Sequence, residues 1–445
     1  MNFADSEVVA SILEQDGYHL INEPKKANLV LLNTCSIRDK AEQTVRKKIK
    51  SFNSYKKQNK NLKLGLLGCM AERLKEKLLD EEKIVDLVVG PDSYKELPNL
   101  LDQVEHNQRA VNVILSKSET YGDISPVRIH NSGINAFVSI TRGCDNMCTF
   151  CVVPFTRGRE RSRSPESILR EISDLYQKGY KEVTLLGQNV DSYLWYGGGP
   201  KKDFKKASED QKKNSKRFSD LLLLIATSFP KLRIRFSTSN PQDMTIDVIE
   251  TMAKYDNICN HIHLPIQSGS DRILKKMNRL HSRDEYLYLV EKIRKIIPNC
   301  GISHDIITGF PTETETDHQD TLSLMNEVKY DFGYMFAYSE RPGTFASRHF
   351  KDDISNEVKQ RRLQEIITLQ QKHSFERNRR FIDTECSVLI EKSSKKSNKH
   401  WSGRISENNV VVFPKYNYSL GDIVNVKVQD CTTATLIGDI NKVKV

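Results

Sequence analysis

The chain of 445 residues lacks any hydrophobic run long enough to cross a membrane, which takes about 20 predominantly apolar residues. Residues 1–7 contain neither a basic nor an apolar stretch, so the sequence does not begin like a secretory signal peptide. The 9 cysteines are an odd number in a long chain, which argues against a disulfide framework. We therefore expect reduced thiols, no membrane association and a cytoplasmic protein.

Acidic residues are fewer than basic ones, 58 against 68, which gives a net charge of +10. A basic excess suits a polyanionic partner, and nucleic acid is the first candidate. Solvated surface lysines explain the same excess equally well. Hydrophobic residues at 38% and charged residues at 28% are ordinary for a folded protein, and the length predicts two to three domains.

The most informative feature that is present is a cysteine triplet, Cys144, Cys148 and Cys151, with the spacing C-x3-C-x2-C. Iron–sulfur clusters are usually held by four thiolates. Three thiolates at this spacing can bind three irons of a cubane and leave the fourth iron open to a substrate or cofactor. A zinc site would need a second Cys or His pair nearby, and none follows. The triplet therefore predicts a catalytic cluster.

The first segment, residues 1–116, alternates helix-like and strand-like runs. Strands are predicted at 28–33, 62–67 and 85–89, and helices at 4–15, 37–55, 71–79 and 94–104. This alternation predicts a doubly wound parallel α/β domain, in which ligands bind at the carboxyl ends of strands. Cys35 and Cys69 each stand just past a predicted strand, so we expect both to face one crevice. Two buried core thiols are the alternative.

This segment opens on a helix, where a βαβ unit begins with a strand. The first strand of such a sheet is normally central, so its absence should leave a gap in the hydrogen-bonded ladder. Either the sheet is rearranged or the natural start lies upstream of Met1. We favour the upstream start.

After a linker at 117–135, the alternation returns in residues 136–372. Strands are predicted at 136–140, 182–186, 233–238, 261–266, 301–308 and 333–338, and helices at 165–177, 220–227, 246–254, 283–296 and 316–328. The pattern predicts a partial (β/α)6 barrel, whose carboxyl strand ends carry the chemistry. An insertion at 197–216 is expected to be solvated, mobile and without a site.

A charged helix at 357–380 leads into the third segment, residues 373–445. Short strands at 387–391, 410–413, 423–428 and 434–437 predict a small all-β, OB-like barrel, a fold that often binds oligonucleotides. The lysines of this segment could contact phosphates. Ordinary surface lysines with no partner are a nearly equal explanation. The lysines in question are Lys392, Lys395, Lys396, Lys399, Lys415 and Lys427.

The cysteine triplet, with Phe150 before its last cysteine, resembles the signature of the radical SAM superfamily. Residues 1–9, 33–38, 67–72 and 89–92 resemble the N-terminal domain of methylthiotransferases. Residues 338–344 and the terminal barrel, which is similar to a TRAM domain, complete the pattern. The resemblance covers nearly the whole chain and points to the radical SAM methylthiotransferase family.

The resemblance implies a [4Fe–4S] cluster on Cys144, Cys148 and Cys151 that cleaves S-adenosyl-L-methionine to a 5′-deoxyadenosyl radical. Gln188 and Asn189 would place the methionyl end of this cofactor. The full set of implied cofactor contacts is Phe150, Gln188, Asn189, Gln267, Ser268 and Gly309.

The family also implies an auxiliary [4Fe–4S] cluster in the N-terminal domain, which supplies or carries sulfur. Three cysteines hold it in the family. This chain has Cys35 and Cys69 and no residue at the position of the first ligand, two residues before Met1. We therefore expect the chain as it starts here to assemble the auxiliary cluster poorly. The isolated Cys259, Cys300, Cys386 and Cys431 are expected to be structural.

The implied reaction is transfer of a methylthio group to C2 of N6-isopentenyladenosine at position 37 of tRNA, beside the anticodon. The third domain would hold the tRNA while the target base is splayed out of its loop. We expect a monomer that takes electrons from a donor such as flavodoxin or ferredoxin, with the sulfur donor left open.

Three alternatives stay open at this point. Sister enzymes modify threonylcarbamoyladenosine in tRNA or an aspartate of a ribosomal protein, although residues 1–9 and 34–38 favour the isopentenyladenosine branch. A tRNA-binding protein with incomplete sulfur insertion belongs to another class, and the intact triplet argues against it.

Overall fold

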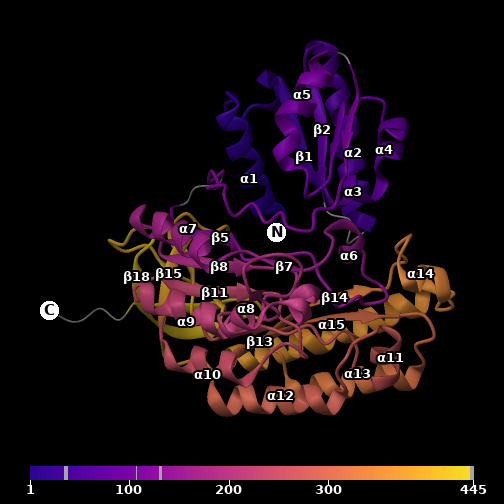
Figure 1. Ribbon diagram of the computed structural model, residues 1–445. Helices are drawn as coiled ribbons and strands as arrows, with labels where there is room; N and C mark the ends of the chain where they lie inside the picture. Colours follow the sequence, from indigo (N-terminus) through magenta and orange to yellow (C-terminus); the bar gives the residue numbers. More distant parts are fainter. Residues whose placement is uncertain (35–38, 107, 130–132, 441–445) are drawn as a thin grey trace.

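The computed structural model describes residues 1–34, 39–106, 108–129 and 133–440, with side chains of residues 39–41 left aside. The predicted ligand Cys35 lies outside the described residues. Three units pack together: an N-terminal α/β unit, a larger α/β unit below it and a C-terminal β-barrel at one side (Figure 1). No helix of the described residues has the length and apolar character needed to cross a membrane.

The N-terminal unit is a four-stranded parallel sheet with the order β1-β2-β3-β4. Helices α2, α3 and α4 pack on one face, and α1 and α5 on the other, as the doubly wound prediction requires. The elements are α1 (Asn2–Gln15), η1 (Pro24–Lys26), β1 (Leu29–Thr34), α2 (Asp39–Gln58), β2 (Lys63–Gly68), α3 (Cys69–Leu74), α4 (Glu76–Glu81), β3 (Leu87–Val89), η2 (Tyr94–Glu96), α5 (Leu97–Glu105) and β4 (Ala110–Asn112).

The expected gap in this sheet is absent from the described residues. Strands β1 and β2 pair directly in parallel, from Leu29 opposite Lys63 to Thr34 opposite Gly68. The facing backbone groups of β1 and β2 are therefore satisfied without a strand between them, and β1 lies at the edge of the described sheet. The predicted helix at 71–79 is also wrong in one respect, because it breaks at Lys75, whose φ is +52°.

The central unit is an open barrel of parallel strands in two runs, β5-β8-β11 and β12-β13-β14. A parallel bridge between Ile234 and Ile258 lies at the seam between the two runs. The predicted partial barrel is confirmed. Its strands are β5 (Asn135–Ser139), β8 (Glu182–Leu186), β11 (Arg233–Ser237), β12 (His261–His263), β13 (Gly301–Thr308) and β14 (Phe332–Ala337), and its main helices are α7 (Pro165–Gln177), α9 (Phe218–Ser228), α10 (Ile246–Lys254), α12 (Arg283–Ile296) and α13 (Glu315–Val328).

Alternating strand residues separate an apolar outer layer from a polar bore. On β13, Ile302 and Ile306 are fully buried in the apolar core against the helices. Ser303 and Asp305, which alternate with them in sequence, line a cavity of about 300 Å³ inside the barrel. Burying one such isoleucine contributes about 1.5–3 kcal/mol. The core therefore fixes the barrel wall, and polar groups remain on its inner side.

Short elements complete the central unit. The insertion predicted at 197–216 holds η3 and α8, and Ser208 and Gln211 form the reciprocal capping box that begins α8. The short elements are β6 (Thr141–Arg142), α6 (Val153–Thr156), β7 (Arg161–Ser162), β9 (Leu194–Trp195), η3 (Lys201–Lys206), α8 (Glu209–Lys213), β10 (Lys216–Arg217), α11 (Asp271–Lys276) and α14 (Phe345–His349).

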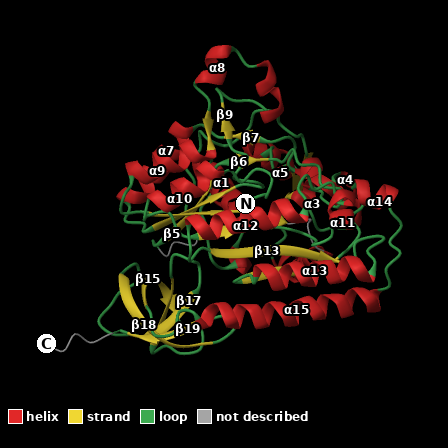
Figure 2. Cartoon of the chain, turned by 90° about the horizontal axis from the view of Figure 1, so that it is seen from below, coloured by secondary structure: helices red, strands yellow, loops and turns green. Residues whose placement is uncertain are grey.

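The long helix α15 (Asn356–Arg379) leads into a closed barrel with the order β15-β16-β17-β19-β18 (Figure 2). The predicted small β-barrel is confirmed, with β16 as a strand that the sequence pattern missed. Its strands are β15 (Glu385–Ser393), β16 (His400–Arg404), β17 (Val410–Pro414), β18 (Ile423–Cys431) and β19 (Leu436–Asp439).

Two arginines of β11 seat this small barrel against the central unit. Arg233 donates to the carbonyl of Arg404 over 3.0 Å. Arg235 donates to the carbonyls of Ile405 and Ser406 over 2.6 and 2.9 Å. Because these acceptors are backbone groups of one turn, the small barrel has a fixed orientation on the central unit.

Candidate active site

The cysteine triplet lies on the loop between β6 and α6, which follows β5 of the open barrel. The backbone N–H of Cys144 donates to the carbonyl of Gly158 over 3.2 Å, and that of Cys151 donates to the carbonyl of Cys148 over 3.0 Å. Gly143 begins this loop with a φ of +73°, and a Cβ there would lie 2.1 Å from the carbonyl oxygen of Arg159. Only glycine fits this close approach.

A second anchor ties the loop to α11. Thr149 donates from its backbone N–H to the carbonyl of Met277 over 3.0 Å and from its hydroxyl to that of Lys276 over 2.9 Å. Phe150 packs beside the buried cluster that contains Ile273 and Phe310. The loop is therefore held on both sides, and the ring of Phe150 forms part of its apolar support.

The three thiols influence one another electrostatically. Burial raises the pKa of Cys144 well above its usual range, and the charges of Cys151 and Cys148 raise it further. Burial and then the charge of Cys148 raise the pKa of Cys151 to about 12. A bound metal cation relieves this repulsion and replaces the thiol protons. Three sulfur donors on one anchored loop, whose charges act on one another, thus fit a [4Fe–4S] cluster.

The predicted methionyl contacts stand at the carboxyl end of β8. Asn189 is buried, and its Nδ2 donates to Oδ2 of Asp243 over 2.6 Å. Its Oδ1 has no hydrogen-bond partner among the described residues. Gln188 is half-buried. Asn189 therefore has an acceptor available for a ligand.

The other predicted contacts are largely engaged within the protein. The hydroxyl of Ser268 is fully buried, 3.5 Å from the Thr321 hydroxyl of α13. Gln267 has a φ of +75° and pairs with Ile306 of β13. Gly309 packs against Lys359, whose Cγ would lie 2.4 Å from a Cβ at that position. The structure thus gives these residues a role in shaping the strand ends, and their contact with cofactor remains a prediction.

Buried carboxyl groups near the triplet were missed by the sequence analysis. Burial raises the pKa of Glu160 to about 7, although Lys201 lies 3.5 Å away and Ser192 donates to it over 2.5 Å. Burial likewise raises the pKa of Asp191 to about 8, against a hydrogen bond from Ser239 over 3.1 Å. The charge of Glu160 acts on Cys144, so a cationic ligand beside the triplet would meet this carboxyl. The sequence signal for Asp191 was its position after strand β8, whereas Glu160, directly before β7, had no such signal.

The N-terminal unit presents its own thiol toward the triplet. Cys69 begins α3 and is buried, and Nε of Arg157 lies 3.2 Å from its Sγ. Its charge also acts on Cys151. Because Thr34 pairs with Gly68, β1 and the strand that precedes Cys69 end level with each other. One N–H of Arg157, Nη1, is buried without a described partner, which fits an anionic, sulfur-rich group beside Cys69.

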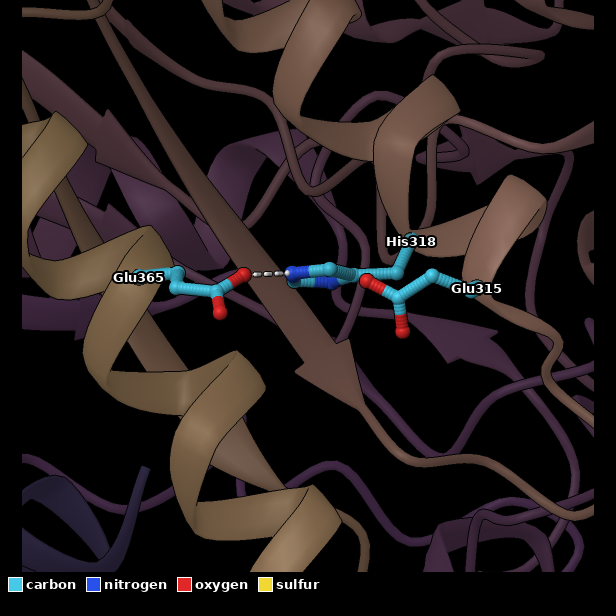
Figure 3. Close-up of side chains that lie close together, drawn as sticks. All are labelled: Glu315, His318 and Glu365. Carbon is cyan, nitrogen blue, oxygen red and sulfur yellow. Dashed lines mark hydrogen bonds and ion pairs between the residues drawn. The ribbon is translucent and has the colours of Figure 1, made fainter.

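Glu315, His318 and Glu365 form a separate cluster between α13 and α15 (Figure 3). Nε2 of His318 lies 2.7 Å from Oε2 of Glu365. Arg361 donates to Glu315 over 2.6 Å and to Glu365 over 2.7 Å. Arg362 also lies 3.3 Å from Glu315. Since two guanidinium groups already pair with the two carboxylates, the cluster is an ion-pair network that joins two helices rather than a metal site.

The remaining isolated cysteines are buried, as expected for structural residues. Cys300 belongs to the core of the central unit, and Cys386 and Cys431 belong to the core of the small barrel. Cys259 is also buried.

The fold and the triplet define the chain as a radical SAM protein. Residues 138–325 match the radical SAM superfamily, residues 379–440 match the TRAM domain, and residues 1–90 match the uncharacterized protein family UPF0004. Among solved structures, the radical SAM methyltransferase TsrM of Kitasatospora setae has a similar fold, with a TM-score of 0.56 and 13% identity over 78% of this chain and 72% of that chain. The cobalamin-dependent radical enzyme OxsB has a TM-score of 0.52 and 12% identity over 80% of this chain and 54% of its own.

Curated relatives narrow the class. The tRNA-2-methylthio-N6-dimethylallyladenosine synthase of Christiangramia forsetii is 69% identical over 99% of this chain and 91% of its own length. The proteins of the same name from Flavobacterium psychrophilum and Flavobacterium johnsoniae are 66% and 65% identical over the same shares. The chain belongs to the tRNA-2-methylthio-N6-dimethylallyladenosine synthase family.

Proposed function

We propose that this chain adds a methylthio group to C2 of N6-isopentenyladenosine at position 37 of tRNA by radical SAM chemistry. The observation that carries the proposal is the triplet Cys144, Cys148 and Cys151, anchored on a loop of the open barrel in a chain that is 65–69% identical to synthases named for this product. Both alternative methylthiotransferase substrates lack such support.

Cys144, Cys148 and Cys151 would hold a [4Fe–4S] cluster with one iron left for S-adenosyl-L-methionine. When bound, the cluster supplies the electron that cleaves the cofactor. Asn189 orients the methionyl end through its unpartnered Oδ1, and the buried carboxyl of Glu160 accepts a cationic part of the ligand. The remaining proposed contacts are Phe150, Gln188, Gln267, Ser268 and Gly309.

Cys35 and Cys69 contribute to the auxiliary [4Fe–4S] cluster of the N-terminal unit. In this proposal Cys69 lies at the interface with the triplet loop, because Arg157 of that loop's continuation contacts its sulfur. Sulfur handled there stays close to the site where the radical forms. Water is excluded from Cys69, which is 3% exposed.

The small barrel binds the tRNA substrate. Lys392, Lys395, Lys396 and Lys399 are exposed along β15 and the turn after it. Lys415 lies 4.1 Å above the ring of Trp401, which places a cation and an aromatic surface together. Phosphates and bases of single-stranded RNA are bound by such groups. We further propose that the protein is a cytoplasmic monomer that takes electrons from a donor such as flavodoxin or ferredoxin.

The test is anaerobic turnover by the reconstituted protein with S-adenosyl-L-methionine, a reductant and isopentenylated tRNA. Nucleoside mass spectrometry should detect 2-methylthio-N6-isopentenyladenosine, and tRNA that carries threonylcarbamoyladenosine should remain unmodified. Methylthiolation of threonylcarbamoyladenosine alone would overturn the substrate assignment. Cofactor cleavage without any methylthiolated nucleoside would favour the tRNA-binding alternative.

A further inference from the structure

Each of the two cysteine sites has one arginine that directs an N–H at a cysteine sulfur. Nη1 of Arg279, in the turn after α11, lies 3.6 Å from Sγ of Cys148. Nε of Arg157, directly after α6, lies 3.2 Å from Sγ of Cys69. Both arginines belong to the central unit, but Arg279 contacts the triplet and Arg157 contacts the thiol of the N-terminal unit.

Arg279 is fixed by a contact that leaves its charge available. Its Nη2 donates to the carbonyl of Pro265 over 2.7 Å. Its Nε is buried without a hydrogen-bond partner, and its printed contacts in the described part of the chain are to Cys148 and Pro265, neither of them a carboxylate. The guanidinium therefore places a positive charge beside the triplet that no counter-ion cancels.

Arg157 is held by more hydrogen bonds than Arg279, and its positive charge is paired with the carboxylate of Asp5. It is 2% exposed, and its Nη2 donates to Asp5 over 2.7 Å and to Asn2 over 2.9 Å. These two acceptors lie on α1, whereas Cys69 begins α3. Arg157 thus joins two elements of the N-terminal unit and holds its Nε against the sulfur.

Hydrogen bonds to cluster sulfurs and nearby charge are main determinants of the reduction potential of an iron–sulfur cluster. Reduction adds one negative charge to the cluster. A fixed N–H donor with positive charge stabilises the reduced form more than the oxidised form, and so raises the potential. An arginine that contacts only one site acts mainly on that site, because interactions between charges weaken with distance.

We propose that Arg279 and Arg157 are positioning residues that set the two cluster potentials separately, Arg279 at the triplet and Arg157 at the site of Cys69. This assignment rests on the proposed function for the presence of both clusters. It adds two residues to the machinery of the reaction, and neither is a cluster ligand. It also gives the protein independent control over the electron used for cofactor cleavage and over the sulfur-handling site.

The test is a redox titration of the reconstituted full chain, followed by electron paramagnetic resonance without tRNA. Arg279→Gln should shift the midpoint of the triplet cluster to a lower potential by about 59 mV, a tenfold change for a one-electron couple. Arg279→Lys, which keeps the charge and loses the planar fork, should shift it less. Iron content per chain identifies variants that do not bind the cluster. If Arg279→Gln is one of them, Arg279→Lys is compared with the wild type instead.

Arg157→Gln supplies the reciprocal arm. It should lower the midpoint of the cluster at Cys69, and it should shift the midpoint of the triplet cluster less, because the charge at Cys69 also acts on Cys151. Arg128→Gln is the matched control, because Arg128 also binds α1, through Glu7 over 2.7 Å, and contacts no sulfur among the described residues. It should move neither midpoint.

A wild-type midpoint in Arg279→Gln would overturn the proposal, as would an equal shift of the triplet midpoint in Arg157→Gln. These readings need no tRNA and no product. A protein with the expected shifts and no methylthiolated nucleoside would therefore refute the proposed function and leave this inference standing.

Discussion

Nη1 of Arg142 donates to Oδ1 of Asp5 over 2.8 Å, with both side chains almost completely buried. Arg142 stands two residues before Cys144, and Asp5 lies on α1 of the N-terminal unit. Burial opposes ionisation of Asp5, but the charges of Arg142 and then Arg157 hold its pKa well below the usual range. One carboxylate therefore joins the N-terminal unit to the loop that carries the triplet.

Asp5→Asn should destabilise this junction strongly. Removing one partner of a buried ion pair leaves an uncompensated charge, at a cost of about 3–5 kcal/mol. Hydrogen exchange measured by mass spectrometry should show faster exchange in α1 than in α12. The exposed Asp123, which pairs with Lys95 over 2.8 Å, is the control position, and Asp123→Asn should change exchange little. Unchanged exchange in α1 of Asp5→Asn would contradict a role for the pair.

The depressed pKa of Asp5 also predicts an acid limit for the junction. A carboxyl whose folded pKa lies below its unfolded value adds stability that is fully present above the unfolded pKa, and this stability is lost as the pH falls through the folded pKa. The wild type should therefore lose protection of α1 below about pH 4. Asp5→Asn should show a weaker pH dependence over the same range.

Glu160 should destabilise the protein without ligands above neutral pH. Burial raises its pKa to about 7 from 4.5, so the folded protein binds more protons than the unfolded chain between these values. Stability then falls as the pH rises through this window. Glu160→Gln should raise the thermal midpoint more at pH 8 than at pH 5. Glu209→Gln, at an exposed position, should have the same small effect at both, and an equal gain at both pH values for Glu160→Gln would refute the assignment.

Cys148→Ala should remove the triplet cluster. The protein should lose about four irons per chain together with S-adenosyl-L-methionine cleavage, measured as 5′-deoxyadenosine. Cys386→Ala is the control, because that thiol is buried in the core of the small barrel. Full iron content in Cys148→Ala would show that the ligand set is wrong.

Replacing Lys395, Lys396 and Lys399 together with alanine should weaken tRNA binding and reduce its salt dependence. The slope of log affinity against log salt should fall by about 0.7–0.9 for each phosphate that is no longer neutralised by a lysine. The control replaces Lys206, Lys212 and Lys213 of the insertion that holds η3 and α8, and so removes the same three charges. Equal weakening of tRNA binding in both variants would mean that net charge, rather than this face, binds tRNA.

The hydrophobic pattern of the sequence predicted helices and strands correctly where the pattern extended over many residues. Strands β8 and β13 and helices α7, α10 and α12 have the predicted bounds, because hydrophobic periodicity over such lengths is decided by neighbours in sequence. Strand β4, of three residues, and the break at Lys75 were missed. Both depend on packing against other elements rather than on local preference.

Within the site, the triplet was predictable and its surroundings were not. The contact between Arg157 and Cys69 joins residues 88 positions apart in the chain. The contact between Asn189 and Asp243 joins residues 54 positions apart. No spacing rule connects such pairs, because their meeting depends on how whole units pack.

The sequence by itself determined the chemistry of the first cysteine site, since Cys144, Cys148 and Cys151 lie close together in the chain and need only a local loop to converge. It also determined the class of each unit, because alternating strands and helices have few ways to bury their apolar faces. Only the tertiary structure decided that Cys69 faces the triplet, that Arg279 and Arg157 each meet one sulfur, and that β1 and β2 pair directly. These relationships arise from burial shared between distant segments, which no stretch of the chain specifies alone.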